Sequence, residues 1–313
     1  MRISLTDGGG LSSSLCTQLK DYGLSLHPST TICRHLMYNG QVVLGEKITL
    51  QGCKLDSYSC MSKFASLNLC SIGRYSTIGV HSEIGLITHN MAAFSSSYCL
   101  TAENARNFGL PEIKRPSQVT ARMHGEFVPQ VTIGHDVTVE PYVIMPKAVT
   151  IGHGAIIRAN TVVTKDVPPY AIVAAGSRGS QVVGTRFSDE IIADLLELSW
   201  WDYDLPTMLI QGIVIPFHDI KAFISLFSLA KQENFPRLSD KWLYLMRESQ
   251  DKVNLYEVSP DCQRLTLFPR HGTEQFISAV QAEMKRQMLY QQQRQLFHLP
   301  SKVNGPYGIT LTT

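Results

Sequence analysis

Histidine is the residue type of this sequence best suited to proton transfer near neutral pH, because an imidazole has an ordinary pKa near 6.5. His89 lies in the segment LITHNMAAFSSSY, just after a run of regular repeats and before a serine-rich stretch. There it is either a base that removes a proton from a hydroxyl group or an ordinary loop histidine. The triplet Gly8-Gly9-Gly10 lacks the G-K-[ST] ending of a phosphate-binding loop, so no nucleotide triphosphate site is predicted there.

The elements that must position His89 are set by a six-residue repeat on either side of residues 86–130. A large apolar anchor recurs at Ile72, Ile78, Ile84, Ile133, Val139, Met145, Ile151, Ile157 and Val163. In the second run, a small or β-branched residue follows each anchor by four positions. A glycine follows the anchor directly at Gly73, Gly79, Gly85, Gly134 and Gly152. The stretch 86–130 has no such period and is predicted to be a loop insertion.

A period of six is neither that of a helix nor the simple alternation of a long strand. It predicts a short strand plus a corner per repeat, with three repeats to a triangular turn, and glycines that supply positive φ near the corners. The alternative, a sandwich with evenly spaced strands, fits six successive anchors in register poorly. His135 and His153 are 18 residues apart, so they should stack at one corner, as solvent-facing turn residues or, alternatively, as metal ligands. Leu44 and Leu50 suggest degenerate earlier coils in 38–60.

Three segments carry a resemblance to a known family. They are CSIGRYSTIG at 70–79, the long repeat run ending in TKDVPPYAIV at 131–173, and FSDEIIADLLELSWWDYDLP at 187–206. Together they resemble the xenobiotic (chloramphenicol and streptogramin) branch of the hexapeptide-repeat acetyltransferases. The resemblance implies a mainly β fold built on a left-handed parallel β-helix.

The resemblance also implies an activity and a site. Members of this family are trimers in which acetyl-CoA lies in a groove between neighbouring prisms, so each active site needs two subunits. By the match of the loop segment, His89 is the general base, and the acetyl group passes directly to the acceptor. Ala159, Thr164 and Lys165 occupy the positions that line the CoA groove, with Lys165 either meeting a CoA phosphate or merely solvated.

The sequence departs from the family pattern in three places. Thr138, in DVTVE, stands where relatives have tryptophan in DVWIG. The usual G-x-G before the final anchor reads Arg158-Ala159-Asn160, and GNPAK after YAIV is replaced by AAGSRGSQ, in which Arg178 is a candidate substitute for the phosphate-binding lysine. These changes leave open altered CoA contacts, another acyl donor or lost activity.

The leading functional hypothesis is O-acetylation of a sugar or saccharide hydroxyl. An antibiotic acetyltransferase is the runner-up, N-acetylation of an amino sugar is a third reading, and a catalytically silent β-helix used for binding or assembly is the competitor from another class. Besides acetyl-CoA as co-substrate, no metal is expected.

Composition limits the partners and the location. The net charge of +2 gives no field that would favour nucleic acid, and no run of 18 apolar residues predicts a membrane span. Seven cysteines without a C-x-x-C pair and the lack of a signal-peptide pattern at the N-terminus favour the cytoplasm, where acetyl-CoA would be found.

The chain is divided into four parts by these signals. Residues 1–37 are an N-terminal segment, and 38–187 form the β-helix domain with its loop insertion. A bracing helix is expected in 188–206, with Ser188 as its N-cap. The extension 207–313 has no counterpart in the resemblance and is expected to be mainly α-helical, with an amphipathic run at 273–299.

Overall fold

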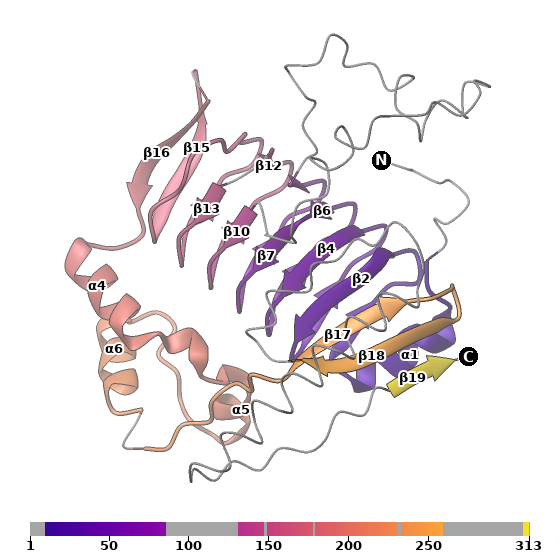
Figure 1. Ribbon diagram of the computed structural model, residues 1–313. Coiled ribbons are helices and arrows are strands. Elements are labelled where there is room, and N and C mark those ends of the chain that lie inside the picture. Colours follow the sequence, from indigo (N-terminus) through magenta and orange to yellow (C-terminus); the bar gives the residue numbers. More distant parts are fainter. Residues whose placement is uncertain are drawn as a thin grey trace, which may run out of the picture.

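A computed structural model describes residues 10–85, 131–146, 149–177, 179–230, 233–258 and 309–312. Within these ranges, short strands stack as the successive coils of a parallel β-helix, seen as a row of rungs across Figure 1. The predicted parallel β-helix is therefore confirmed. The coils contribute short strands to three faces.

Face A is one continuous parallel sheet. Its strands are β1 (Leu24–Leu26), β3 (Val42–Leu44), β5 (Cys60–Met61), β8 (Thr77–Ile78), β11 (Thr138–Val139), β14 (Ile156–Ile157) and β15 (Ala171–Gly176). After β15, strand β16 (Gly179–Thr185) turns back antiparallel and ends the sheet.

Faces B and C share the two longest strands of the coils, β2 (Thr31–Asn39) and β4 (Thr49–Leu55), which continue from one face around a corner to the other. Face B then continues with β6 (Ser66–Asn68), β9 (Glu83–Ile84) and β12 (Ile144–Met145). Face C continues with β7 (Cys70–Ile72), β10 (Val131–Ile133) and β13 (Val149–Ile151).

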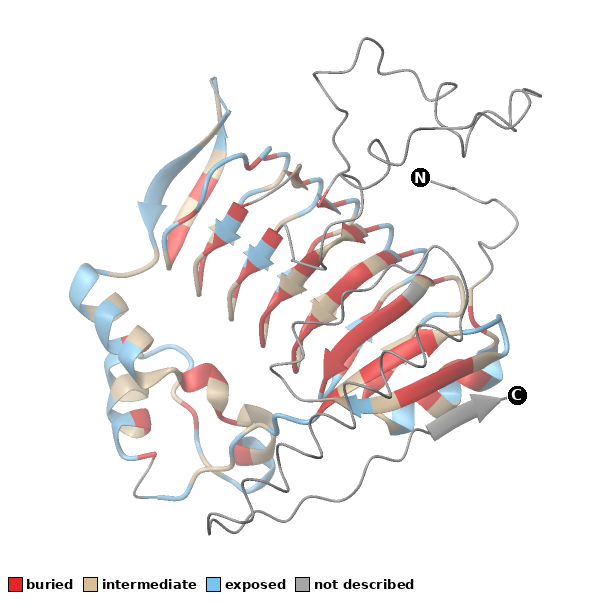
Figure 2. Ribbon diagram, viewed as in Figure 1, coloured by how far each residue is buried: buried red, intermediate tan, exposed pale blue. Residues whose placement is uncertain are grey.

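The predicted anchors form the core of the prism. All nine, from Ile72 to Val163, are at most 2% exposed, and so are Leu44 and Leu50 of the earlier coils. Figure 2 shows buried and exposed positions alternating along β10 and β13, as expected for strands with one face inside and one in solvent. A narrow core of stacked apolar side chains thus stabilises every coil through its two neighbours.

The insertion does not disturb the register of the coils. Ile78 of β8 pairs with Val139 of β11, and Ile84 of β9 pairs with Met145 of β12, as if residues 86–130 were absent. The wall of the prism is therefore continuous past the point where the insertion leaves it.

The role predicted for the repeat glycines is wrong in part. Of the five, Gly85 alone has a positive φ, of 74°. At Gly134, an added Cβ would lie 2.8 Å from the backbone nitrogen of His153 in the next coil. Close approach of adjacent coils, and not backbone freedom, requires glycine there. The positive φ values fall two residues later, on non-glycine corner residues such as Tyr75 and Asp136.

The first coil begins at β1, ahead of the expected boundary at residue 38. Before it, helix α1 (Ser13–Asp21) buries Leu15 and Leu19 against the end of the prism, and Ser12 caps the helix by accepting the Leu15 N–H at 3.4 Å. This end is extended by β17 (Trp242–Arg247), which pairs antiparallel with β2, by β18 (Lys252–Val258) and by β19 (Ile309–Thr312).

Helices follow the last coil on one side of the prism (Figure 1). They are α4 (Asp189–Leu198), the 3-10 helix η3 (Trp200–Asp202), α5 (Leu205–Ile210) and α6 (Ile220–Ser228). A helix was predicted at α4, with Ser188 as its N-cap residue, and Ser188 does occupy that position in extended geometry. The described part of the extension is not mainly helical, because β17 and β18 follow α6, and the amphipathic run at 273–299 lies outside the described residues.

Candidate functional site

Two of the predicted site residues, His89 and Arg178, lie outside the described residues. The strands of face B on either side of residues 86–130, β9 and β12, are described. There, β9 ends at Ile84, and the Gly85 N–H donates to the Met145 carbonyl at 2.8 Å. The described chain therefore stops on face B just after β9, four residues before His89.

A shallow hollow of about 440 Å³ lies along face B and its corner with face A. It is lined by Phe64, His81, Glu83, Tyr142, Ile144, Asn160 and Val162. These residues come from four successive coils, so the hollow runs along the prism axis. It ends on the rung that carries the predicted CoA-binding residues, which include neither Asn160 nor Val162 of the lining.

Stacked rings form one edge of this hollow. His81 lies between Phe64, at 4.8 Å between ring centroids, and Tyr142, at 5.0 Å, with nearly parallel planes. The Lys47 ammonium lies over the outer face of Phe64, 5.4 Å from its centroid. All three ring residues have a positive φ at the same corner of successive coils. The sequence signal for this ladder was the spacing of 17 between Phe64 and His81, close to one coil.

The described CoA candidates lie on the last rung of face B. Val162 bridges to Ile144 of β12 in parallel register, and Ala159 precedes this bridge while Thr164 and Lys165 follow it. Ala159 is half-buried, and both Thr164 and Lys165 are exposed. The three therefore flank one end of the hollow, with Asn160 and Val162 of its lining between them.

The Ala159 amide already has a partner. Its N–H donates to Glu140 Oε2 at 2.9 Å, and the same oxygen lies 3.2 Å from Arg158 Nε. Glu140 and Arg158 follow the paired residues Val139 and Ile157, so the two side chains meet on adjacent coils. Arg158 was noted in the sequence as a departure from the family pattern, but Glu140 and its contact with Arg158 were not predicted.

Thr138, where the family pattern has tryptophan, faces outward on β11 and is exposed. It pairs with Thr77 on one side and Ile156 on the other. A hydroxyl and a methyl group thus replace a large indole on the outer surface of face A.

His135 and His153 stack as predicted, with ring centroids 4.9 Å apart. The expectation that they face solvent is wrong, because Trp201 of η3 stacks against both, 4.5 Å from His153 and 5.3 Å from His135. Burial, together with the charges of His153 and Arg74, lowers the pKa of His135 to about 3. Burial also lowers the pKa of His153, against an opposing effect of Asp202. In the part of the chain that the structure describes, no three histidine, cysteine or acidic side chains gather as a metal site.

Arg74 joins the prism to the segment that follows it. Its guanidinium contacts three carboxylates, Asp56 at 3.3 Å, Asp202 at 2.6 Å and Asp240 at 2.8 Å. Sequence reasoning missed this cluster, since Asp202 and Asp240 lie 128 and 166 residues beyond Arg74 and outside the repeats. The cluster is a structural link and lies at a different corner from the hollow.

Comparisons with known proteins agree with this geometry. Residues 130–165 match the family model of bacterial transferase hexapeptide (six repeats). Chloramphenicol acetyltransferase of Klebsiella aerogenes is 44% identical over 73 residues, which cover 23% of this chain and 34% of the relative. Galactoside O-acetyltransferase of Escherichia coli (strain K12) is 38% identical over 73 residues, covering 23% and 36%. The resemblance to hexapeptide-repeat acetyltransferases is confirmed. The chain spans about a third of the length of these curated relatives.

Among solved structures, one similar chain is the acetyltransferase domain of PglB from Neisseria gonorrhoeae FA1090 in complex with acetyl coenzyme A. It is 12% identical, with a TM-score of 0.35, and the match covers 53% of this chain and 64% of that one. Each helix in the described ranges lacks the length and apolar character that crossing a lipid bilayer requires.

Proposed function

We propose that this protein is an acetyl-CoA-dependent O-acetyltransferase that acts on a hydroxyl group of a sugar or saccharide. The observation that carries the proposal is the axial hollow on face B. It ends beside Ala159, Thr164 and Lys165, and it lies on the face that holds β9, the last described strand before His89. A long, shallow groove on a stiff wall suits the extended pantetheine arm of CoA. The second wall would come from a neighbouring copy in a homotrimer.

In the proposed reaction His89 is the general base. Its imidazole takes the proton of the acceptor hydroxyl as the oxygen attacks the thioester carbonyl carbon. The tetrahedral intermediate then collapses, the carbon–sulfur bond breaks, and the CoA sulfur leaves with a proton. No acyl-enzyme is formed. Lys165, exposed at the end of the groove, and Arg178 are proposed to meet CoA phosphates.

Two alternatives remain in view. The similarity to chloramphenicol acetyltransferase supports an antibiotic acceptor in place of a saccharide. Thr138 and the engaged Ala159 amide support a β-helix without catalysis. If the protein is this enzyme, we propose that it works in the cytoplasm, where acetyl-CoA is found. The five cysteines in the described ranges are all free thiols, which suits a reducing compartment.

Thiol release from acetyl-CoA tests the proposal. The purified chain is incubated with acetyl-CoA and a panel of sugars, oligosaccharides, chloramphenicol and a streptogramin, and free thiol is followed over time. We expect turnover with a saccharide and a loss of about 100-fold or more in His89→Ala. His218→Ala, which removes an exposed histidine outside the groove, should behave as the parent.

Each outcome decides between the readings. Equal rates for the parent and His89→Ala would remove His89 from the mechanism. Turnover restricted to chloramphenicol or the streptogramin would favour the antibiotic reading. If the protein neither released thiol nor bound CoA, the alternative of a β-helix that binds or assembles without catalysis would be favoured.

A further inference from the structure

The Glu140 carboxylate contacts a residue that the proposed function assigns to donor binding. It accepts the Ala159 N–H at 2.9 Å, and Ala159 is one of the residues expected to contact CoA. Asn160, the next residue, and Tyr142, two residues after Glu140, both line the hollow. The carboxylate is thus bonded to an amide at the edge of the groove.

Arg158 holds this carboxylate in place. Its Nε lies 3.2 Å from Glu140 Oε2, the oxygen that also accepts the amide. The two backbones are fixed by the coil, since the Glu140 N–H donates to the Ile157 carbonyl and the Arg158 N–H to the Val173 carbonyl, both at 2.8 Å.

The pair is weak enough to open. The Glu140 side chain is 31% exposed and that of Arg158 is 59% exposed, so water can solvate both charges when they separate. A carboxylate at this position also repels the phosphates of an anionic donor. Its presence therefore opposes donor binding in two ways, by occupying the amide and by its charge.

We propose that Glu140 is a latch on the donor groove. In the free protein its carboxylate occupies the Ala159 amide, and it must release that amide before a carbonyl oxygen of acetyl-CoA can accept the same hydrogen bond. Glu140 acts through Ala159 and is a positioning residue that sets donor affinity. This inference rests on the proposed function, since it concerns the same groove.

Calorimetric titration of the full chain with CoA tests the latch. We expect Glu140→Ala to bind CoA about threefold to tenfold more tightly than the parent, which is the range that one released hydrogen bond of this kind supplies. Glu140→Gln keeps an oxygen acceptor without the charge and should lie between the two. In kinetics, the KM for acetyl-CoA should fall by the same factor while kcat changes less.

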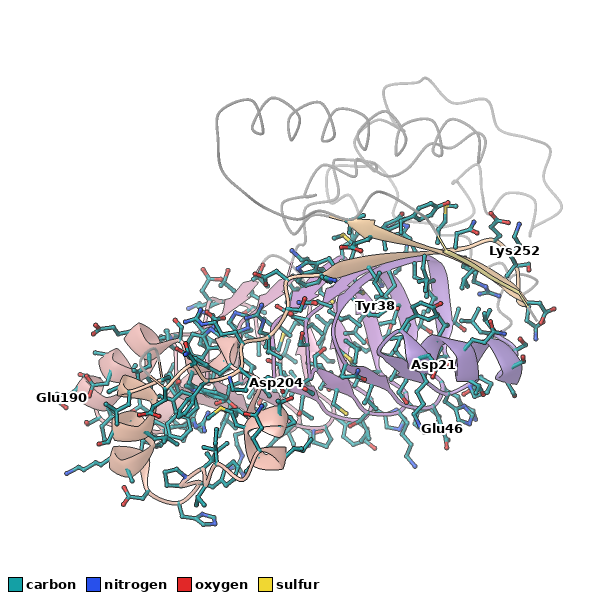
Figure 3. All side chains as sticks on the ribbon, turned by 90° about the horizontal axis from the view of Figure 1, so that it is seen from below. Asp21, Tyr38, Glu46, Glu190, Asp204 and Lys252 are labelled. Carbon is teal, nitrogen blue, oxygen red and sulfur yellow. The ribbon has the colours of Figure 1, made fainter. Side chains whose placement is uncertain are left out.

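The matched control is Glu248→Ala. Glu248 pairs with Lys252 at 2.7 Å, in the turn between β17 and β18. Figure 3 shows Lys252 at the opposite end of the molecule from Glu190 of α4. This variant removes the same charge and an equivalent ion pair, and its CoA affinity should equal that of the parent.

Amide hydrogen exchange gives a second measurement. In the free protein the Ala159 amide should exchange about tenfold faster in Glu140→Ala than in the parent, because its acceptor is gone. Equal exchange would show that the carboxylate does not hold the amide.

The outcomes separate the latch from the proposed function. CoA binding by the parent with unchanged or weaker binding by Glu140→Ala would overturn the latch alone. If Glu140→Gln and Glu140→Ala bound CoA with the same increase in affinity, the charge of Glu140 alone would account for the effect. That result would also overturn the latch. Absence of CoA binding in the parent and in every variant would reject the proposed function and the latch with it. Binding by Glu140→Ala alone would support both.

Discussion

His135 and His153 stack ring on ring with their planes inclined by only 6°. The Arg74 N–H donates to His135 Nδ1 at 2.8 Å, and the His135 N–H donates to His153 Nδ1 at 2.9 Å. Each Nδ1 therefore accepts a hydrogen bond from a backbone N–H. A proton added to Nδ1 would point at that N–H and break the hydrogen bond. Burial lowers the pKa of both imidazoles, and this arrangement of hydrogen bonds is consistent with the neutral form of each ring.

The first prediction is that the protein loses stability in mild acid. His135 has a folded pKa of about 3 and an ordinary unfolded value of 6.5. Below pH 6.5 the unfolded chain takes up a proton that the folded chain refuses, so the free energy of unfolding falls as the pH falls towards 3. By this linkage His135 alone lowers stability by about 2 kcal/mol at pH 5 relative to pH 7.

Urea unfolding at pH 7 and pH 5 measures this effect. The comparison is with His135→Asn, whose Oδ1 can take the place of Nδ1 as acceptor but does not titrate. The variant should lose about 2 kcal/mol less than the parent between the two pH values. Equal losses in the two proteins would mean that His135 is not held neutral.

The second prediction concerns Arg74, whose side chain is only 9% exposed. Arg74→Ala leaves three carboxylates around an empty site, and the buried Asp56 loses its cation. We expect a loss of about 3 kcal/mol in the free energy of unfolding, as for other buried pairs broken on one side. Arg74→Lys should lose less, because an ammonium keeps the charge but not the forked geometry.

Lys252→Ala is the control for the Arg74→Ala variant. It breaks the more exposed pair with Glu248 and should cost less than about 1 kcal/mol. Thermal unfolding of the three variants checks the order. A loss at Arg74→Ala no greater than that at Lys252→Ala would show that the cluster does not hold the post-coil segment to the prism.

The coils could be predicted from the sequence because each repeat is a local unit. The six-residue period fixes which side chains point inward, and the spacing of 18 between His135 and His153 fixes their stacking. The pairing of β17 with β2 could not be predicted. It joins segments about 200 residues apart, and β17 shows no six-residue period.

The candidate site was predictable only in part. The positions of Ala159, Thr164 and Lys165 on the last rung follow from the repeat register. The contact between Glu140 and the Ala159 amide does not, because it depends on where a side chain turns after it leaves a corner. Likewise the burial of His135 required Trp201, which comes from a helix beyond the repeats.

The third prediction tests the inward anchors with two adjacent isoleucines of β14. Ile157 is fully buried, and Ile156 lies half-buried on the outer side. Ile157→Ala should cost about 2 to 5 kcal/mol, because it leaves a cavity in a narrow stacked core. Ile156→Ala should cost about 1 kcal/mol or less. Equal costs measured by urea unfolding would contradict the assignment of the inward face.

The last prediction concerns the reason for glycine after the anchors. In Gly134→Ala the new methyl group would meet the backbone nitrogen of His153 at 2.8 Å and its Nδ1 at 2.9 Å. The coils cannot separate locally without breaking the hydrogen bond from the Gly134 N–H to the Ile151 carbonyl, so we expect a loss of about 1 to 3 kcal/mol. Gly184→Ala in β16 meets nothing within 4 Å and should be neutral or stabilising by up to about 1 kcal/mol. Thermal unfolding of the two variants compares them directly. Because neither glycine has a positive φ, a similar response at both sites would show that close approach of the coils is not what requires glycine at 134.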